Sequence, residues 1–289
     1  MRYPGRLIKM GETDARIVQA LKRALNRALA RETALLLDEN NAHFGPRMKQ
    51  VIKLFQARHV DADGRPLKQD GEVGSITWAV LFGPGSVPRP APPADPFLAR
   101  VLRLAAGEEA KAVREKPLNS NRGPQVDAYL ARIGLDPGYA WCCAFVYWCF
   151  DEAALAVQRS NPMVRTGGCM RHWNAAPAAG ARRIPAHEAL ADPSLLRSGA
   201  VFIMDHGRGL GHTGFIEAID GGFITTIEGN TDASMTREGG GVYRLRRKLA
   251  EINKGYVDYA GLVTLPPSAL PRRAARKPAT PQATRKRKA

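Results

Sequence analysis

The chain has 289 residues and a formal net charge of +16. This length allows two domains of ordinary size, and no apolar stretch is long enough to span a bilayer. The four cysteines contain no Cys-x-x-Cys pair, and the histidines lack the usual ligand spacing of a zinc site. We therefore expect a soluble, modular protein that needs neither a metal nor an organic cofactor.

The first 83 residues show the apolar spacing of short helices. Residues 14–30 and 44–58 both place apolar side chains three or four positions apart. Two Asp-Gly turn signals follow, and a third short helix is expected to begin near Ser75. This pattern predicts a small all-α domain of three helices around one core.

Three segments of this region carry a resemblance, namely Val51-Ile-Lys-Leu-Phe-Gln56, Asp70-Gly-Glu-Val-Gly74 and Thr77-Trp78-x-x-Leu81. As a set they resemble the three-helix peptidoglycan-binding domain over residues 5–83. The resemblance implies that domain 1–83 binds peptidoglycan. A helical bundle with another use is the alternative, because helical spacing indicates a core and not a ligand.

Residues 84–96 are the expected linker. Together with Gly83 they contain six prolines and almost no large apolar side chain. Such a segment favours a semi-rigid, extended spacer with few contacts between the parts that it joins. A second, larger domain is expected over residues 97–265.

Cys142 is the candidate nucleophile of the second domain. It is expected to open an apolar helix, whose positive end favours a thiolate and whose unpaired N–H groups could bind an oxyanion. Cys143, Cys149 and Cys169 are expected to be small, buried, apolar side chains.

A base and an orienting group follow in the sequence. His212 stands among glycines just before an apolar run, which suggests a strand entry with an accessible imidazole. Glu228 and Asn230 are expected on the next strand, where positions i and i+2 share a face. One of them is expected to hold the imidazole through Nδ1, and the other to position the substrate or an oxyanion. His206 is the alternative base, although its surroundings suggest an exposed loop.

Four segments of this second part carry a further resemblance, namely Trp141-Cys142-x-x-Phe145-Val146, Ser198-Gly-Ala-Val-Phe202, Gly211-His212-x-Gly214 and Glu228-Gly-Asn230. Together they resemble the CHAP domain, a family of cysteine, histidine-dependent amidohydrolases and peptidases in the papain-like superfamily. The resemblance covers roughly residues 97–265. It implies an α+β fold in which a helix-borne cysteine packs on an antiparallel sheet. It also implies that Cys142 and not Cys143 is the nucleophile, because the family places the cysteine directly after the tryptophan.

Residues 266–289 contain eight Lys or Arg and no acidic residue. This composition predicts a disordered basic tail. Such a tail attracts anionic wall polymers or membranes, and a solubilising terminus is the alternative. No motif that reads DNA accompanies it, so no specific nucleic-acid partner is expected.

The residues and resemblances together predict a monomeric peptidoglycan hydrolase that cleaves an amide bond in or next to the stem peptide. Either an N-acetylmuramoyl-L-alanine amidase or an endopeptidase fits. A phage endolysin is the first interpretation; a secreted interbacterial toxin and a non-catalytic wall-binding protein are the alternatives. The first residues lack the apolar core of a secretory signal, so we expect synthesis in the cytoplasm and release through a holin, a secretion system or lysis.

Overall fold

A computed structural model describes residues 1–30, 35–87, 95–235 and 239–264. The helices in chain order are α1 (Ala15–Ala28), α2 (Pro46–Arg58), α3 (Ser75–Phe82), α4 (Pro96–Ala110), α5 (Pro124–Arg132), α6 (Cys142–Leu155), α7 (Cys169–Ala175) and α8 (Ala186–Ala191). The strands are β1 (Arg182–Pro185), β2 (Val201–Gly207), β3 (Leu210–Asp220), β4 (Phe223–Thr231), β5 (Gly241–Lys248) and β6 (Gly255–Asp258).

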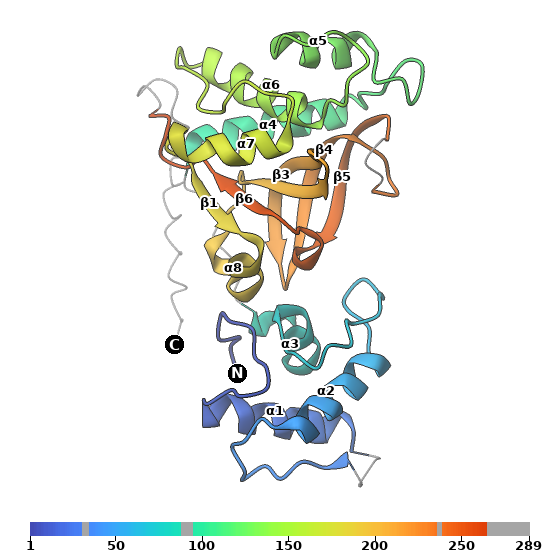
Figure 1. Cartoon of the computed structure of the whole chain (residues 1–289), viewed down its shortest axis with the longest axis vertical. Helices are drawn as coiled ribbons and strands as arrows, with labels where there is room; N and C mark the ends of the chain where they lie inside the picture. Colours follow the sequence, from blue (N-terminus) through green and yellow to red (C-terminus); the bar gives the residue numbers. More distant parts are fainter. Residues whose placement is uncertain (31–34, 88–94, 236–238, 265–289) are drawn as a thin grey trace, which may run out of the picture.

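Helices α1, α2 and α3 form a separate layer at one end of the molecule (Figure 1). The side chain of Asp14 starts α1 by accepting hydrogen bonds from two backbone N–H groups of the first turn. The buried faces of the three helices share one core, which includes Val18, Leu21, Leu25, Met48, Ile52, Phe55 and Trp78.

The first core extends past residue 83, the boundary expected from the sequence. Val87 is buried in that core, and the N–H of Tyr3 donates to the carbonyl of Ser86 at 2.8 Å. The first residues of the proline-rich segment therefore belong to the first domain, because one apolar side chain and one backbone hydrogen bond attach them to it.

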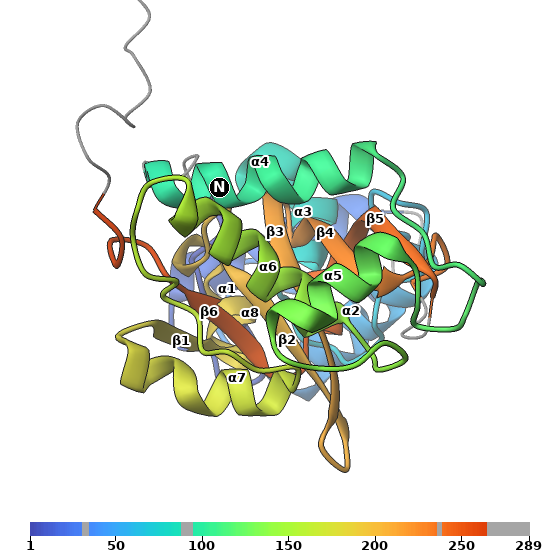
Figure 2. The same cartoon turned by 90° about the horizontal axis from the view of Figure 1, so that it is seen from above.

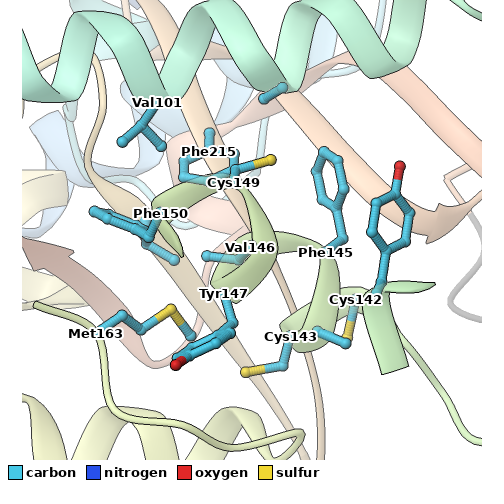
Figure 3. Close-up of a cluster of buried hydrophobic side chains, with 14 of the residues drawn as sticks. Val101, Cys142, Cys143, Phe145, Val146, Tyr147, Cys149, Phe150, Met163 and Phe215 are labelled. Atoms are coloured by element: carbon cyan, nitrogen blue, oxygen red, sulfur yellow. The ribbon is translucent and has the colours of Figure 1, made fainter. Parts of the chain in front are cut away.

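The second domain is built on one antiparallel sheet with the strand order β1-β6-β2-β3-β4-β5. Helices α4 and α6 cover one face of it, with α5 outside them (Figures 1 and 2). Aromatic rings of α6 fill the space above the central strands; Phe145 and Phe150 both contact Phe215 of β3 (Figure 3). The α+β fold expected from the sequence, with a helix-borne cysteine on an antiparallel sheet, is confirmed.

Charged side chains join the two domains along the end of β5. Three ion pairs connect them: Asp61 with Lys248 at 2.7 Å, Asp63 with Arg246 at 2.7 Å, and Arg65 with Glu251 at 3.0 Å. The proline-rich linker predicted few contacts between the two domains, and these three ion pairs are more contacts than that prediction allowed. The ion pairs join residues that are far apart in the sequence, so no pattern of neighbouring residues could predict them.

The turn between β3 and β4 also reaches the first domain. Gly222 has φ of +93°, and a Cβ there would lie 2.5 Å from Cγ1 of Ile76 in α3. A side chain at this position would therefore push the two domains apart. A cavity of about 250 Å³ lies at the same junction and is lined by residues that include Ile76, Phe223 and Arg246.

Among the described residues, no helix combines the length and the apolar character needed to cross a membrane. The basic tail expected at residues 266–289 lies outside the described residues, as do residues 88–94 of the linker.

Candidate active site

Cys142 is the first residue of α6. The carbonyl of Trp141 accepts the first hydrogen bond of the helix, from the N–H of Phe145 at 2.9 Å. The N–H groups before Phe145 therefore lie at the positive end of the helix, where no earlier turn can satisfy them. The cysteine itself is only 3% exposed. The residues that open α6 thus give a buried thiol a set of backbone donors.

His212 and Glu228 lie on neighbouring strands beneath this helix start. His212 is in β3, Glu228 is in β4, and both side chains are buried. His212 Nε2 is 2.7 Å from Glu228 Oε2. The expected contact through Nδ1 is wrong, because Nε2 at the outer edge of the ring is the nitrogen that reaches the adjacent strand.

The remaining nitrogen of His212, Nδ1, is buried and has no hydrogen-bond partner among the described residues. Cys142 lies close enough to raise the pKa of the imidazole, and because Nε2 is committed to Glu228, Nδ1 is left for the thiol. Burial alone would lower the pKa of His212, but Cys142 and Glu228 outweigh it and raise the pKa to about 9. Both contacts therefore stabilise the imidazolium that forms when His212 takes the thiol proton.

The thiol is subject to opposing effects. The neighbouring Cys169 and burial raise the pKa of Cys142, whereas His212 acts in the opposite direction. Cys169 and burial thus favour the thiol form of Cys142, and His212 favours the thiolate. Proton transfer to His212 is consequently a step that would convert Cys142 to a nucleophilic thiolate.

The spacing that was expected to place Asn230 on the face of Glu228 is interrupted by an irregularity in β4. The pairing of β4 with β5 shifts between Glu228 and Thr231, and Asn230 has φ of +60°. This β-bulge breaks the alternation on which the expectation rested. The side chain is 1% exposed, and neither its amide nitrogen nor its amide oxygen has a hydrogen-bond partner among the described residues. The amide is therefore available to a substrate or an oxyanion.

Gly214 makes room for the carboxylate. A Cβ at this position would lie 2.8 Å from Cγ of Glu228 and 2.8 Å from the carbonyl oxygen of Ile227. Any larger residue in β3 would therefore displace the side chain that holds His212. The glycine after the histidine in the sequence is explained by this close approach.

Arg247 was not found from the sequence. It lies in β5, and its Nε and Nη2 each donate to Glu228 at 2.7 Å. Thr226 Oγ1 also donates to Glu228 Oε1. Burial alone would raise the pKa of Glu228, but Arg247 and His212 outweigh it and lower the pKa to about 2. The sequence did contain a signal for a buried basic residue. Residues 246–248 are three consecutive basic residues, and they cannot all lie on one face because a strand turns every second side chain to the opposite face.

The other cysteines and His206 lie as follows. Cys149 is fully buried in the core, and Cys143 leaves α6 in a different direction from Cys142 (Figure 3). Cys169 is buried as expected, yet its Sγ is 3.7 Å from Cys142 Sγ.

His206 is exposed near the end of β2, whereas His212 is the histidine that contacts Glu228. Among the described residues, no group of three or more His, Cys, Asp or Glu could hold a metal ion.

The comparisons with known proteins identify the segment that carries this arrangement. Residues 134–230 match the family model of the CHAP domain. This segment is a CHAP domain. It contains Cys142, His212, Glu228 and Asn230, and the CHAP resemblance seen in the sequence is confirmed over these matched residues. The CHAP domain supports a cysteine- and histidine-dependent amidase or peptidase that acts on peptidoglycan in general. No curated protein and no solved structure matches the chain.

Proposed function

We propose that this protein hydrolyses an amide bond in or next to the stem peptide of peptidoglycan, with Cys142 as nucleophile. The observation that carries the proposal is the contact of His212 Nε2 with Glu228 at 2.7 Å, which leaves Nδ1 for Cys142. Nucleophile, base and orienting carboxylate are then in the order that acyl transfer requires.

The reaction proceeds in two halves. His212 takes the proton of Cys142, and the thiolate attacks the carbonyl carbon of the amide. The N–H of Cys142 and the amide of Asn230 stabilise the oxyanion. His212 then protonates the leaving amine as the C–N bond breaks, which leaves a thioester. Water, deprotonated by His212, attacks the thioester, releases the carboxylic acid and returns the proton to Cys142.

The first domain is proposed to hold the polymer while the CHAP domain cuts it. Residues 1–83 resemble the peptidoglycan-binding domain, and the ion pairs along β5 fix this domain beside the catalytic one. Tethering the enzyme to insoluble wall raises the effective concentration of bonds near Cys142.

Digestion of purified sacculi followed by mass spectrometry of the released fragments tests the function. Cleavage between muramic acid and L-Ala would identify an amidase, and cleavage between two amino acids would identify an endopeptidase. Fragments released by breaking a glycosidic bond would contradict the proposal. Binding to sacculi without release would favour the non-catalytic wall-binding alternative.

For the biological role, we propose a phage endolysin ahead of a secreted interbacterial toxin. A neighbouring holin gene would favour the endolysin and a neighbouring immunity gene would favour the toxin, and production of the chain in a bacterial cytoplasm with and without a co-produced holin tests the endolysin role. An endolysin should lyse the cells only when the holin is present. Lysis that needs no holin would contradict this role.

A further inference from the structure

We propose that Arg247 is a positioning residue for the hydrolysis described above: it fixes the carboxylate of Glu228, and through it the orientation and tautomer of His212. This inference rests on the proposed function. The match to the CHAP domain ends at residue 230, and Arg247 lies 17 residues beyond it (247 − 230). The family match therefore gives no role to Arg247.

The contact has the geometry of a two-pronged clamp. Nε and Nη2 of Arg247 donate separately to the two oxygens of Glu228, each at 2.7 Å. The planar fork of a guanidinium matches a carboxylate, and the ammonium of a lysine cannot reproduce that match. Both oxygens are thereby held, and the carboxylate cannot turn about its last bond.

The clamp is buried. Arg247 is 4% exposed and Glu228 is fully buried. Its two neighbours on the strand face the other way, since Arg246 and Lys248 pair with Asp63 and Asp61 of the first domain. A buried charge is costly without a partner, and Glu228 is the partner that the structure gives Arg247.

The tautomer follows from the charge of Glu228. An ionised carboxylate only accepts hydrogen bonds, so Nε2 of His212 must carry the hydrogen. The neutral ring then has its lone pair on Nδ1, where it can take the proton of Cys142. A protonated Glu228 would donate to Nε2 instead and would place the ring hydrogen on Nδ1, which could no longer act as the base.

The surroundings of Glu228 define what a pH measurement reports. The titratable and charged groups that face it are His212 from β3 and Arg247 from β5, with Cys142 of α6 and Cys169 of α7 beyond the imidazole. Glu251 acts on Arg247 from the end of the sheet. Of these groups, Arg247 supplies a fixed positive charge directly on the carboxylate.

The experiment compares Arg247→Met and Arg247→Lys with Arg244→Met, all in the full chain. Arg244 is a matched control because it lies on the same strand and pairs with the half-buried Glu217 and Glu109 instead of Glu228. The rate of Cys142 alkylation by iodoacetamide is measured against pH, with the labelled peptide identified by mass spectrometry. This readout needs no peptidoglycan, so it stands even if the proposed function is wrong.

In Arg247→Met the onset of Cys142 alkylation should move to higher pH by at least about one unit, because burial alone raises the pKa of Glu228. Hydrolysis of soluble muropeptides should fall by about 10- to 100-fold in kcat with little change in KM. Arg247→Lys should keep the wild-type onset, since the charge remains, but lose part of kcat because the fork is gone. Arg244→Met should match the wild type in both.

Two outcomes would overturn the proposal. One is a folded Arg247→Met with the wild-type onset and kcat, which would make Arg247 a structural counter-charge only. The other, decisive if Arg247→Met does not fold, is an Arg247→Lys variant with unchanged kcat, which would show that the fork positions nothing. If the wild type hydrolyses no peptidoglycan, but Arg247→Met still shifts the onset of Cys142 alkylation, the result counts against the proposed function and not against the role of Arg247.

A different observation carries a second inference about the same proposed site. Cys142 Sγ and Cys169 Sγ are 3.7 Å apart on α6 and α7, both buried and both free. We infer that Cys169 is a resolving thiol that protects the nucleophile from irreversible oxidation. A hydroperoxide transfers one oxygen to the Cys142 thiolate and leaves as an alcohol or water, which gives a sulfenic acid. The Cys169 thiol then attacks that sulfur, water leaves, and a disulfide forms that a thiol reductant reopens.

Treatment of the full chain with hydrogen peroxide and then dithiothreitol tests this inference. The wild type should lose and regain activity, with a Cys142–Cys169 linked peptide in the oxidised sample. Cys169→Ser should not recover and should accumulate sulfinic acid at Cys142, whereas the control Cys149→Ala should recover like the wild type. Full recovery of Cys169→Ser, or oxidation without the linked peptide, would contradict it. The linked peptide is detected without any peptidoglycan, so it is independent of the proposed function.

Discussion

The imidazole of His212 is the centre of the site, because Nε2 contacts the buried carboxylate of Glu228 and Cys142 raises the pKa of the ring. Glycines on the same strand let other groups approach, and Gly214 leaves room for Glu228. The next residues outward, Arg247 and Thr226, complete the set of donors to that carboxylate. The chemistry of Cys142 therefore depends on residues from three strands as well as from its own helix.

Replacement of His212 by Ala should lower kcat/KM for soluble muropeptides by at least about 100-fold, the scale of losing a general base. His206→Ala should cost much less, because His206 is exposed near the end of β2. Comparable losses in the two variants, with both folded by circular dichroism, would place His206 in the mechanism as well.

The sequence predicted which residue types meet, and it failed on how they meet. Cys142, His212 and Glu228 were found because each stands in a short segment with an obvious chemical role. The choice of Nε2, the bulge at Asn230 and the contact of Arg247 with Glu228 depend on how the strands pair. A pattern of single residues cannot show these, since a bulge is set by the pairing of two strands.

Among the elements, α7 packs against the sheet beside the site. It carries Cys169 next to the nucleophile, and it carries His172, whose Nε2 is 2.6 Å from the hydroxyl of Tyr259. His172 is fully buried, and burial lowers its pKa to about 4. This helix is therefore attached to the rest of the domain by a histidine that must stay neutral.

The stability of the protein should peak near pH 6.5. The pKa of His172 is lower in the folded state than in the unfolded state, so stability is lost as pH falls from 6.5 towards 4, by about 3 kcal/mol. The pKa of His212 is raised to about 9, so its contribution is present below pH 6.5 and is lost as pH rises through 9.

Urea midpoints measured from pH 4 to 9.5 check both limbs. The variant His172→Gln should flatten the acid limb above pH 4.5 and leave the alkaline limb unchanged. An acid limb of the same slope in the variant would contradict the role of His172. Carboxylates add a further loss at lower pH, where the contribution of Glu228 disappears between about 4.5 and about 2.

At the scale of the whole molecule, the helices of the first domain and the sheet of the second were predictable, and their junction was not. The helices begin and end within about two residues of the expected positions, because apolar spacing reports helices directly. The ion pairs of Asp61 and Asp63 with β5 were missed, because charges far apart in sequence give no local signal.

The double variant Asp61→Asn, Asp63→Asn should loosen this junction. It removes the acidic partners of Lys248 and Arg246. In calorimetry, the single unfolding transition of the wild type should split into two, or the temperature of the first transition should fall by several degrees. Asp38→Asn is the control, since it removes an exposed acid elsewhere in the same domain. Identical curves for all three proteins would show that the ion pairs do not hold the domains together.

The basic tail should act through long-range attraction. Deletion of residues 266–289 removes +8 of the net +16, and should slow attack on anionic sacculi at low salt and flatten the salt dependence. Screening shortens the reach of these charges to about 8 Å at physiological ionic strength. Turnover of a small neutral peptide should stay the same. An equal fall on that peptide would contradict attraction at a distance.

The most direct test of the account is a comparison of Cys142→Ala with Cys143→Ala in the hydrolysis of purified peptidoglycan, followed as newly released amino groups. The two cysteines are adjacent and buried, but the pKa of His212 is raised by Cys142 and not by Cys143. We expect no release above background from Cys142→Ala and most of the wild-type rate from Cys143→Ala. Release that survives in Cys142→Ala and disappears in Cys143→Ala would show that the nucleophile, and the site built around it here, is wrong.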